Sequence, residues 1–270
     1  VPETGVNFQP GMPAVVMITE ADFVTRYGEK TPLDRCVLAA DIQRVLAKSP
    51  QRLAIDFDLS PMLGSNAIDE QCQLRLDSLL DEHSQKLTVL VPFATANRAL
   101  LEKKHAWMGA RCQAGLAFAD GQLDTAMGMV TEHTVGEGAD LKARIAEQMR
   151  EGPSDHICKQ VTTAGAYDAN PWLNEQRRKM AAETDHPSVP LHFSHAITQL
   201  GVMPLHSDAL DGVPTFEGSP VLLGGDWGRD DRFLTSAGEQ PGAVVHGVRV
   251  VNLAYPVKLP SAWLALLMDM

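Results

Sequence analysis

The hydrophobic pattern alternates short apolar runs with longer amphipathic stretches. Residues 14–18, 52–58 and 87–91 each contain an apolar run short enough for a strand buried on both faces of a parallel sheet. Residues 31–49 and 67–84 carry apolar side chains at helix-type spacing, and the first of these helices is expected to open at a Thr-Pro-Leu segment. This order of strand, helix, strand, helix and strand predicts parallel pairing with helical crossovers.

The remainder of the chain adds a less regular middle and a clear final unit. Periodicity is weak from about residue 95 to residue 190, which we expect to form an irregular insertion. A last apolar run at residues 221–223 ends in two glycines, an acidic loop follows, and residues 243–253 predict a helix. The predicted fold is therefore a three-layer α/β structure with a mostly parallel sheet and helices on both faces.

The two ends of the chain differ from its centre. Residues 1–13 are rich in Pro and Gly and are expected to form an arm or linker. Residues 14–256 are expected to form a single α/β domain. Residues 257–270 predict either an amphipathic terminal helix or a segment that leads toward a membrane span. Since the chain starts at a valine and ends in this apolar segment, we interpret it as an excised domain.

Composition narrows the class of partner. The chain has 270 residues, of which 44% are hydrophobic and 21% charged, as in ordinary globular proteins. Its 23 basic and 34 acidic residues give a formal net charge of −11, which argues against a nucleic-acid or anionic-membrane partner. No apolar run has the length of a transmembrane helix, and the N-terminus carries no signal-peptide pattern.

Four cysteines are present, and none forms a Cys-x-x-Cys pair, so a structural zinc site has little support. Cys36 and Cys72 lie within apolar helical patterns, where free cysteine acts as a small hydrophobic residue. Cys112 and Cys158 flank loop regions and would bridge only in an oxidising compartment. The sequence leaves that second pairing open.

Acidic residues follow three of the predicted strands. The carboxyl ends of parallel strands share one edge of a sheet, where α/β proteins bind ligands. These acids would repel one another without a bound divalent cation or a counter-charge, which Arg35 would supply for one acid and Arg229 or Arg232 for another. Each acid taken alone is better explained as the cap of a following helix or as a salt-bridge partner than as a ligand, whereas the acids taken together exceed what capping requires. The acids at issue are Glu20, Asp22, Asp56, Asp58, Asp226, Asp230 and Asp231.

Two further side chains belong to the final unit. Trp227 lies in the acidic loop and is a candidate for the wall of a pocket. His246 opens the last helix, where we expect it to be buried and structural rather than catalytic. The predicted ligand-binding residues are therefore Asp22, Arg35, Asp56, Asp58, Asp226, Trp227 and Asp231. If a metal ion is bound, we expect Asp56, Asp58 and Asp226 to be its ligands.

One short motif indicates an enzyme. The sequence from Asp56 to Ser60 resembles the Asp-x-Asp-x-Thr/Ser pattern of haloacid-dehalogenase-like phosphohydrolases. By that resemblance Asp56 would be the nucleophile and Asp58 the general acid, while Asp226 and Asp230 would hold magnesium. No lysine stands at an obvious position to support the nucleophile.

A second resemblance covers nearly the whole chain. Four segments in the same order resemble the type-two CHASE domain, a sensory module of bacterial signalling proteins. They are the apolar strand Val15–Asp22, the helix opening Thr31–Ala40 with its proline and Arg35, the strand Leu53–Asp58, and the closing pattern from Val221 to Gly247 with its late Asp231, Pro-Gly and His246.

This second resemblance implies a non-catalytic, extracytoplasmic domain that receives a small-molecule or protein signal. In the family such a domain is anchored by membrane spans and controls an intracellular output domain, such as a two-component kinase or a cyclase. Its localisation would be periplasmic or extracellular, and a homodimer is an open alternative. The magnesium-dependent phosphohydrolase and a purely structural interaction module are the two competing hypotheses.

Overall fold

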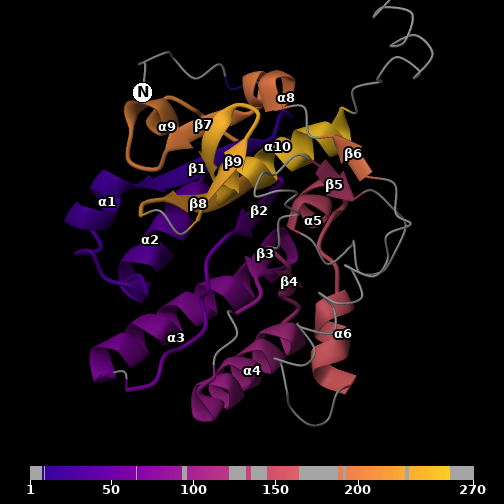
Figure 1. Ribbon diagram of the computed structural model, residues 1–270. Coiled ribbons are helices and arrows are strands. Elements are labelled where there is room, and N and C mark those ends of the chain that lie inside the picture. The colour runs from indigo at the N-terminus through magenta and orange to yellow at the C-terminus, as the bar shows by residue number, and fades with distance from the viewer. Residues whose placement is uncertain are drawn as a thin grey trace, which may run out of the picture.

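The computed structural model describes residues 8, 10–64, 66–92, 96–121, 132–134, 145–163, 188–190, 193–228 and 231–255. Within them, six parallel strands form one sheet in the order β4-β3-β2-β8-β1-β7 (Figure 1). The strands are β1 (Ala14–Thr19), β2 (Arg52–Ile55), β3 (Leu87–Leu90), β4 (Ala117–Ala119), β7 (Gly201–Pro204) and β8 (Pro220–Asp226). The predicted parallel α/β sheet is confirmed. The predictions for residues 1–7, 9 and 256–270 lie outside the described residues.

Side chains of each strand alternate between two hydrophobic cores, one on either face of the sheet. In β1, Val16 and Ile18 point into the first core, whereas Val15 and Met17 point into the second. All four side chains are at most 5% exposed. An unbroken apolar run is therefore what a strand covered on both faces requires.

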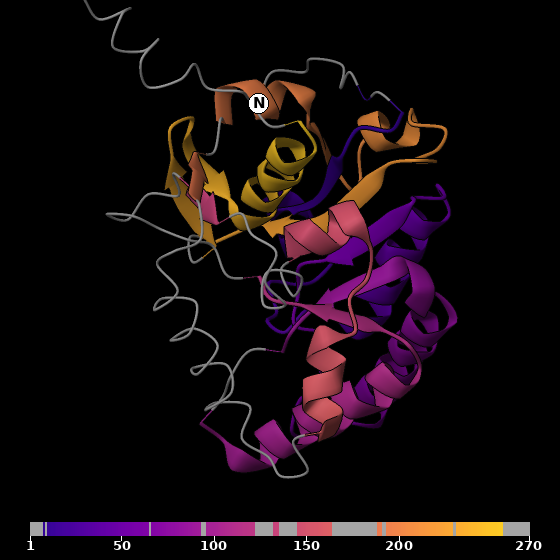
Figure 2. The ribbon, with the colours of Figure 1, turned by 90° about the vertical axis from the view of Figure 1, so that its right-hand side faces the viewer.

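Helices cover both faces (Figures 1 and 2). The first core is covered by α2 (Arg35–Leu46), α3 (Ala67–Glu82) and α4 (Arg98–Gln113). The second is covered by α5 (Ile145–Glu151), α8 (Phe193–Gln199) and α10 (Gly242–Ala254). Smaller elements complete the described chain: α1 (Glu20–Thr25), the 3₁₀ turn η1 (Ser84–Lys86), β5 (Glu132–Thr134), α6 (His156–Thr163), β6 (Ser188–Pro190), α9 (Asp208–Asp211), β9 (Arg232–Thr235) and β10 (Gly238–Pro241).

Capping residues set where the first long helix starts. Asp34 accepts hydrogen bonds from the amides of Cys36 and Val37, so α2 begins at Arg35. The prediction that the Thr-Pro-Leu segment opens this helix is wrong, because Pro32 precedes the cap, after a cis peptide bond.

Two disulfides join helices that cover the first core. Cys36–Cys72 connects α2 to α3, and Cys112–Cys158 connects α4 to α6. The prediction that Cys36 and Cys72 are free is wrong, because α2 and α3 pack side by side and bring their Cα atoms to 4.7 Å. The sequence left the pairing of Cys112 with Cys158 open, and the structure contains this disulfide.

The described chain enters and leaves at the same edge of the sheet. Near the start of β1, the amide of Gly11 donates to Ser219, the residue before β8. At the end of α10, the carbonyl of Leu253 accepts from Arg150, whose own carbonyl accepts from Arg52 at the start of β2. Both ends therefore lie at the edge where the strands begin (Figure 1). No helix among the described residues is long and apolar enough to cross a membrane.

Candidate functional site

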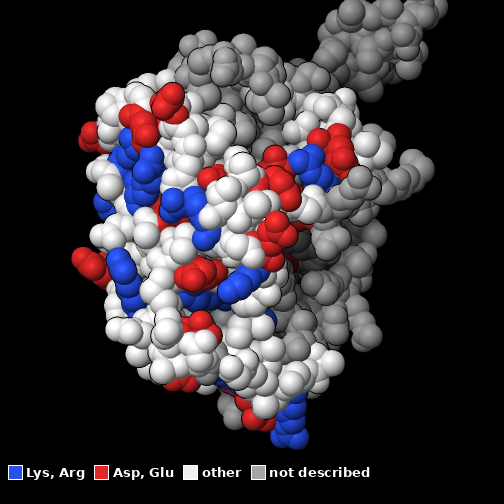
Figure 3. Space-filling model, turned by 90° about the vertical axis from the view of Figure 1, so that its left-hand side faces the viewer, with Lys and Arg blue, Asp and Glu red and all other residues white. Residues whose placement is uncertain are grey.

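The carboxyl ends of β1, β2 and β8 lie side by side at the opposite edge of the sheet, onto which Figure 3 looks. Thr19 at the end of β1 pairs with Asp226 at the end of β8. Asp56 follows β2, and its amide donates to the carbonyl of Leu223 over 2.9 Å. Acidic and basic side chains are interspersed across this face (Figure 3). The structure thus brings the three acidic strand ends to one edge and assigns them different partners.

The acids after β1 serve the local fold. Asp22 is 7% exposed, and its Oδ2 accepts from the amide and hydroxyl of Thr19 over 3.0 and 2.8 Å. The Thr19 hydroxyl accepts from the Asp22 amide in return, which closes a capping box at the start of α1. Glu20 accepts from the amide of Gly228 in the loop after β8. Asp22 therefore caps α1, and Glu20 connects α1 to the loop after β8.

Asp58 belongs to a buried ion pair. Its Oδ2 lies 2.6 Å from the ammonium of Lys104 on α4, and its Oδ1 accepts from the amide and hydroxyl of Ser60. The guanidinium of Arg35 donates to the backbone carbonyls of Asp58 and Ser60, each over 3.0 Å. Burial lowers the pKa of this guanidinium, and the charge of Asp58 opposes that shift. Arg35 therefore supports the loop after β2, instead of serving as the counter-charge of Asp226 or Asp231.

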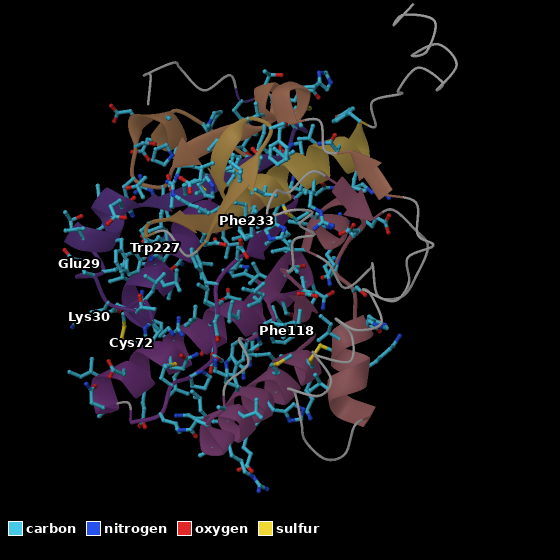
Figure 4. The ribbon with its side chains drawn as sticks, in the orientation of Figure 1. Glu29, Lys30, Cys72, Phe118, Trp227 and Phe233 are labelled. Atoms are coloured by element: carbon cyan, nitrogen blue, oxygen red, sulfur yellow. A yellow bond between two sulfur atoms is a disulfide. The ribbon has the colours of Figure 1, made fainter. Side chains whose placement is uncertain are left out.

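Asp226 and Trp227 also have partners of their own. Asp226 forms an ion pair with Arg232 at the start of β9. The ring of Trp227 lies between those of Phe23 and Phe57, with ring centroids 5.1 and 5.6 Å away and interplanar angles of 9° and 24°. Figure 4 labels Trp227 near the carboxyl end of β8, beside α1. Trp227 thus covers the edge as part of an aromatic stack.

Of the predicted ligand-binding acids, Asp56 and Asp231 are the two without a side-chain partner among the described residues. Asp56 Oδ1 and His246 Nε2 lie 3.6 and 3.8 Å from the point where a Cβ on Gly121 would sit. The Asp231 carboxylate lies against Gly242, with its oxygens 2.5 and 2.8 Å from a Cβ placed there. Asp56, Asp231 and His246 therefore surround the start of α10.

The electrostatics of this cluster favour bound protons. Burial, together with the negative charge of Asp231, raises the pKa of Asp56 to about 7. Burial of the carboxylate against Gly242 raises the pKa of Asp231 to about 6, although the residue as a whole is exposed. His246 is 2% exposed, as its predicted structural role requires. Two weakly acidic carboxyls beside an imidazole can bind a proton or a cationic group.

Among the residues that the structure describes, a divalent cation finds no ready ligand set at this edge. Of the three predicted ligands, Asp58 is paired with Lys104 and Asp226 with Arg232, which leaves Asp56. Among the described residues, the one group of three potential ligands that lie within 4.8 Å of one another is Asp34, Cys36 and Cys72. Both of its cysteines are in a disulfide. Asp230, named by the phosphohydrolase resemblance, lies outside the described residues.

Sequence reasoning missed Lys104. The residue lies in the middle of α4 among other charged residues, and no motif marks it. Its burial depends on how α4 packs beside the loop after β2, which the sequence of α4 alone does not reveal.

Fold and site together define a three-layer parallel α/β protein with an acidic cluster at the carboxyl edge of its sheet. Comparison of the chain with protein-family models, with curated proteins and with solved structures finds no match.

Proposed function

We propose that the chain is a non-catalytic, extracytoplasmic sensory domain of a membrane-bound bacterial signalling protein. The observation that carries this proposal is the polarity of the domain. The described chain enters β1 and leaves α10 at the amino edge of the sheet, whereas Asp56 and Asp231 lie at the carboxyl edge. A sensor tethered through both of its ends would thus present its acidic cluster away from the tether.

The disulfides support an oxidising compartment. Cys36–Cys72 and Cys112–Cys158 account for all four cysteines of the chain. Structural disulfides persist in the periplasm and outside the cell, whereas cytosolic thiols are kept reduced. This pairing favours an extracytoplasmic location over a cytosolic enzyme.

The resemblance to the type-two CHASE domain supplies the partners of the proposal. Its four segments correspond to β1 with α1, the start of α2, β2, and the unit from β8 to α10. Two of them end at the carboxyl edge, one begins α2 there, and the closing unit passes through it between β8 and α10, so the resemblance concentrates where the acids lie. The proposed partners are membrane spans, an intracellular output domain of kinase or cyclase type, and a small-molecule or protein signal.

Thiol accessibility in cells that make the full natural protein tests the location. After mild reduction, a membrane-impermeant maleimide should label the cysteines while the inner membrane is intact. Labelling that requires lysis of the inner membrane would place the domain in the cytosol and end the proposal.

Signal reception is tested in the same cells by following the output activity. Asp56→Asn and Asp231→Asn should change the dependence of the output on external pH, because both carboxyls titrate near neutrality. Glu82→Gln, an exposed substitution on α3, is the matched control. An output that responds to pH identically in all three variants and the wild type would exclude the cluster as a receiver.

The phosphohydrolase alternative retains one observation in its favour, since a lysine, Lys104, does reach the loop after β2. It binds Asp58, the residue that would have to release a proton as general acid, and Asp226 is held by Arg232. A generic phosphate ester with magnesium, assayed with the wild type and Asp56→Asn, tests this alternative. Turnover by the wild type that is lost in Asp56→Asn would establish it.

A further inference from the structure

A groove opens on the outer side of the carboxyl edge, between the loop before α2, the loop after β2 and the first turns of α3. Its volume is about 930 Å³, at the upper end of the range typical of binding sites. Figure 4 shows Glu29 and Lys30 on one lip, with Cys72 on the α3 side. Asp56 and Asp231 do not line it.

The groove carries an exposed apolar surface. Met62, Leu63 and Leu74 line it and are 36%, 43% and 67% exposed, and Ile68, which belongs to the same stretch of chain, is 72% exposed. These four make up most of the large hydrophobic side chains that are exposed among the described residues. Isolated exposed apolar side chains are ordinary, whereas several gathered at one groove indicate an interaction surface.

Most of the charged groups at the groove already have partners. Arg35 donates to the carbonyls of Asp58 and Ser60, and Lys103 donates to the carbonyl of Met62 over 2.7 Å. The acids engaged within the fold are Asp34 as the cap of α2, Asp69 in the capping box of α3, and Asp77 as acceptor from Gln73 and Trp107.

Three charged side chains at the groove remain without a hydrogen bond or ion pair among the described residues. They are Glu29 and Lys30 on the loop before α2 and Glu70 on α3. Two free carboxylates on opposite lips against one free ammonium leave the groove acidic. An occupant with positive charge beside apolar groups would match both features.

The groove is held in shape by the fold. The Cys36–Cys72 disulfide joins the first turn of α2 to α3, so the elements of the two lips are covalently linked. A surface that needs little rearrangement loses less conformational entropy on binding.

We propose that this groove docks a segment of a partner protein that carries basic and apolar side chains. Basic groups of the segment pair with Glu29 and Glu70, and its apolar side chains contact Met62, Leu63 and Leu74. The inference goes beyond the sensory function and does not depend on it, because docking is measured on the purified domain whatever its location in the cell.

Fluorescence polarisation with a labelled peptide that alternates leucine and lysine tests the docking, next to a peptide of equal length that alternates leucine and glutamate. The lysine peptide should bind and the glutamate peptide should not. Glu29→Gln with Glu70→Gln should weaken binding about five- to tenfold at low ionic strength, because two exposed ion pairs are lost. Glu82→Gln with Glu217→Gln, which removes two exposed acids outside the groove, should leave binding unchanged.

Two further variants separate docking from damage to the fold. Lys30→Glu should tighten binding of the lysine peptide, which a merely destabilised protein would not do. Leu74→Ser should weaken it, since Leu74 is exposed and its loss leaves the core intact. Equal binding of both peptides, no binding of the lysine peptide, or no effect of the double Glu variant would overturn the proposal. Self-association of the domain that is abolished by Leu74→Ser would overturn it in favour of a second copy of this chain.

Discussion

The ammonium of Lys104 lies 2.6 Å from Oδ2 of Asp58, and the two side chains are 8% and 14% exposed. The pair ties the middle of α4 to the loop that follows β2. A buried ion pair adds modest net stability compared with an apolar pair, but removal of one partner leaves the other charge buried and unpaired.

Lys104→Met is therefore expected to lower the free energy of unfolding by about 3–5 kcal/mol. Guanidinium denaturation at neutral pH measures the change. Lys103→Met, at the neighbouring half-buried position, removes one hydrogen bond to the Met62 carbonyl and should change it by at most about 1.5 kcal/mol. Adding Asp58→Asn to Lys104→Met should recover part of the loss. Equal effects of the two lysine substitutions would contradict the importance of the pair.

The raised pKa of Asp56 makes stability depend on pH. In the unfolded chain an aspartate ionises near pH 4, whereas in the folded protein Asp56 ionises at about pH 7. Between these values the folded state holds the proton more tightly, so the free energy of unfolding should fall as the pH rises from about 4 to 7.

Asp56→Asn removes the titrating group and should raise stability at pH 8 by about 1–3 kcal/mol, with a flatter pH profile. Denaturation curves at several pH values compare the variant with the wild type, and Glu217→Gln serves as an exposed control. A variant that is less stable than the wild type at pH 8 would show that the charged form of Asp56 is stabilised by the fold.

Each disulfide should contribute measurably to stability. The Cys36–Cys72 bridge closes a loop with a sequence separation of 36, and Cys112–Cys158 one of 46. Chain-entropy arguments assign about 3–4 kcal/mol to loops of these lengths. Replacing either pair by serines should lower the melting temperature, and peptide mapping under non-reducing conditions should recover these two linkages. A reductant that leaves the melting temperature unchanged would argue against both bridges.

The close approach of α10 to β8 should be intolerant of added volume. A Cβ on Gly224 would collide with the Cβ of Ala243, so Gly224→Ala is expected to cost more than about 2 kcal/mol by displacing the start of α10. Gly109→Ala is the opposite case, since this helical position in α4 has nothing within 4 Å. It should stabilise the protein by up to about 1 kcal/mol. Thermal denaturation of both variants distinguishes the two effects.

Much of the fold could be predicted because unbroken apolar runs mark the strands that are buried on both faces of the sheet. The runs that become β1, β2, β3 and β8 were found within a residue or two of their bounds, except that the second run was extended past Ile55. The run Gly201–Pro204 was missed, because an edge strand of four residues with Gly and Pro at its ends has no distinct pattern. Likewise α6 fell in a stretch interpreted as irregular, although it is tied to α4 by a disulfide.

The sequence predicts at which edge of the sheet the candidate site lies, but not which partner each acid contacts. Acids at strand ends indicated the carboxyl edge, and Asp56 and Asp231 do surround the start of α10 there. Which acids are already satisfied depends on partners from distant elements, such as Lys104 for Asp58. Local sequence carries no sign of such pairings, so capping and binding acids looked alike.

The position of β8 governs when the domain can fold as it is synthesised. β8 pairs with β1 on one side and β2 on the other, yet it is the last of the six strands to leave the ribosome. A nascent chain that stops before Pro220 leaves the facing edges of β1 and β2 unpaired, and pairing across such long separations is slow. The native sheet therefore closes only when most of the domain has been synthesised, because the strand that joins its two halves comes last.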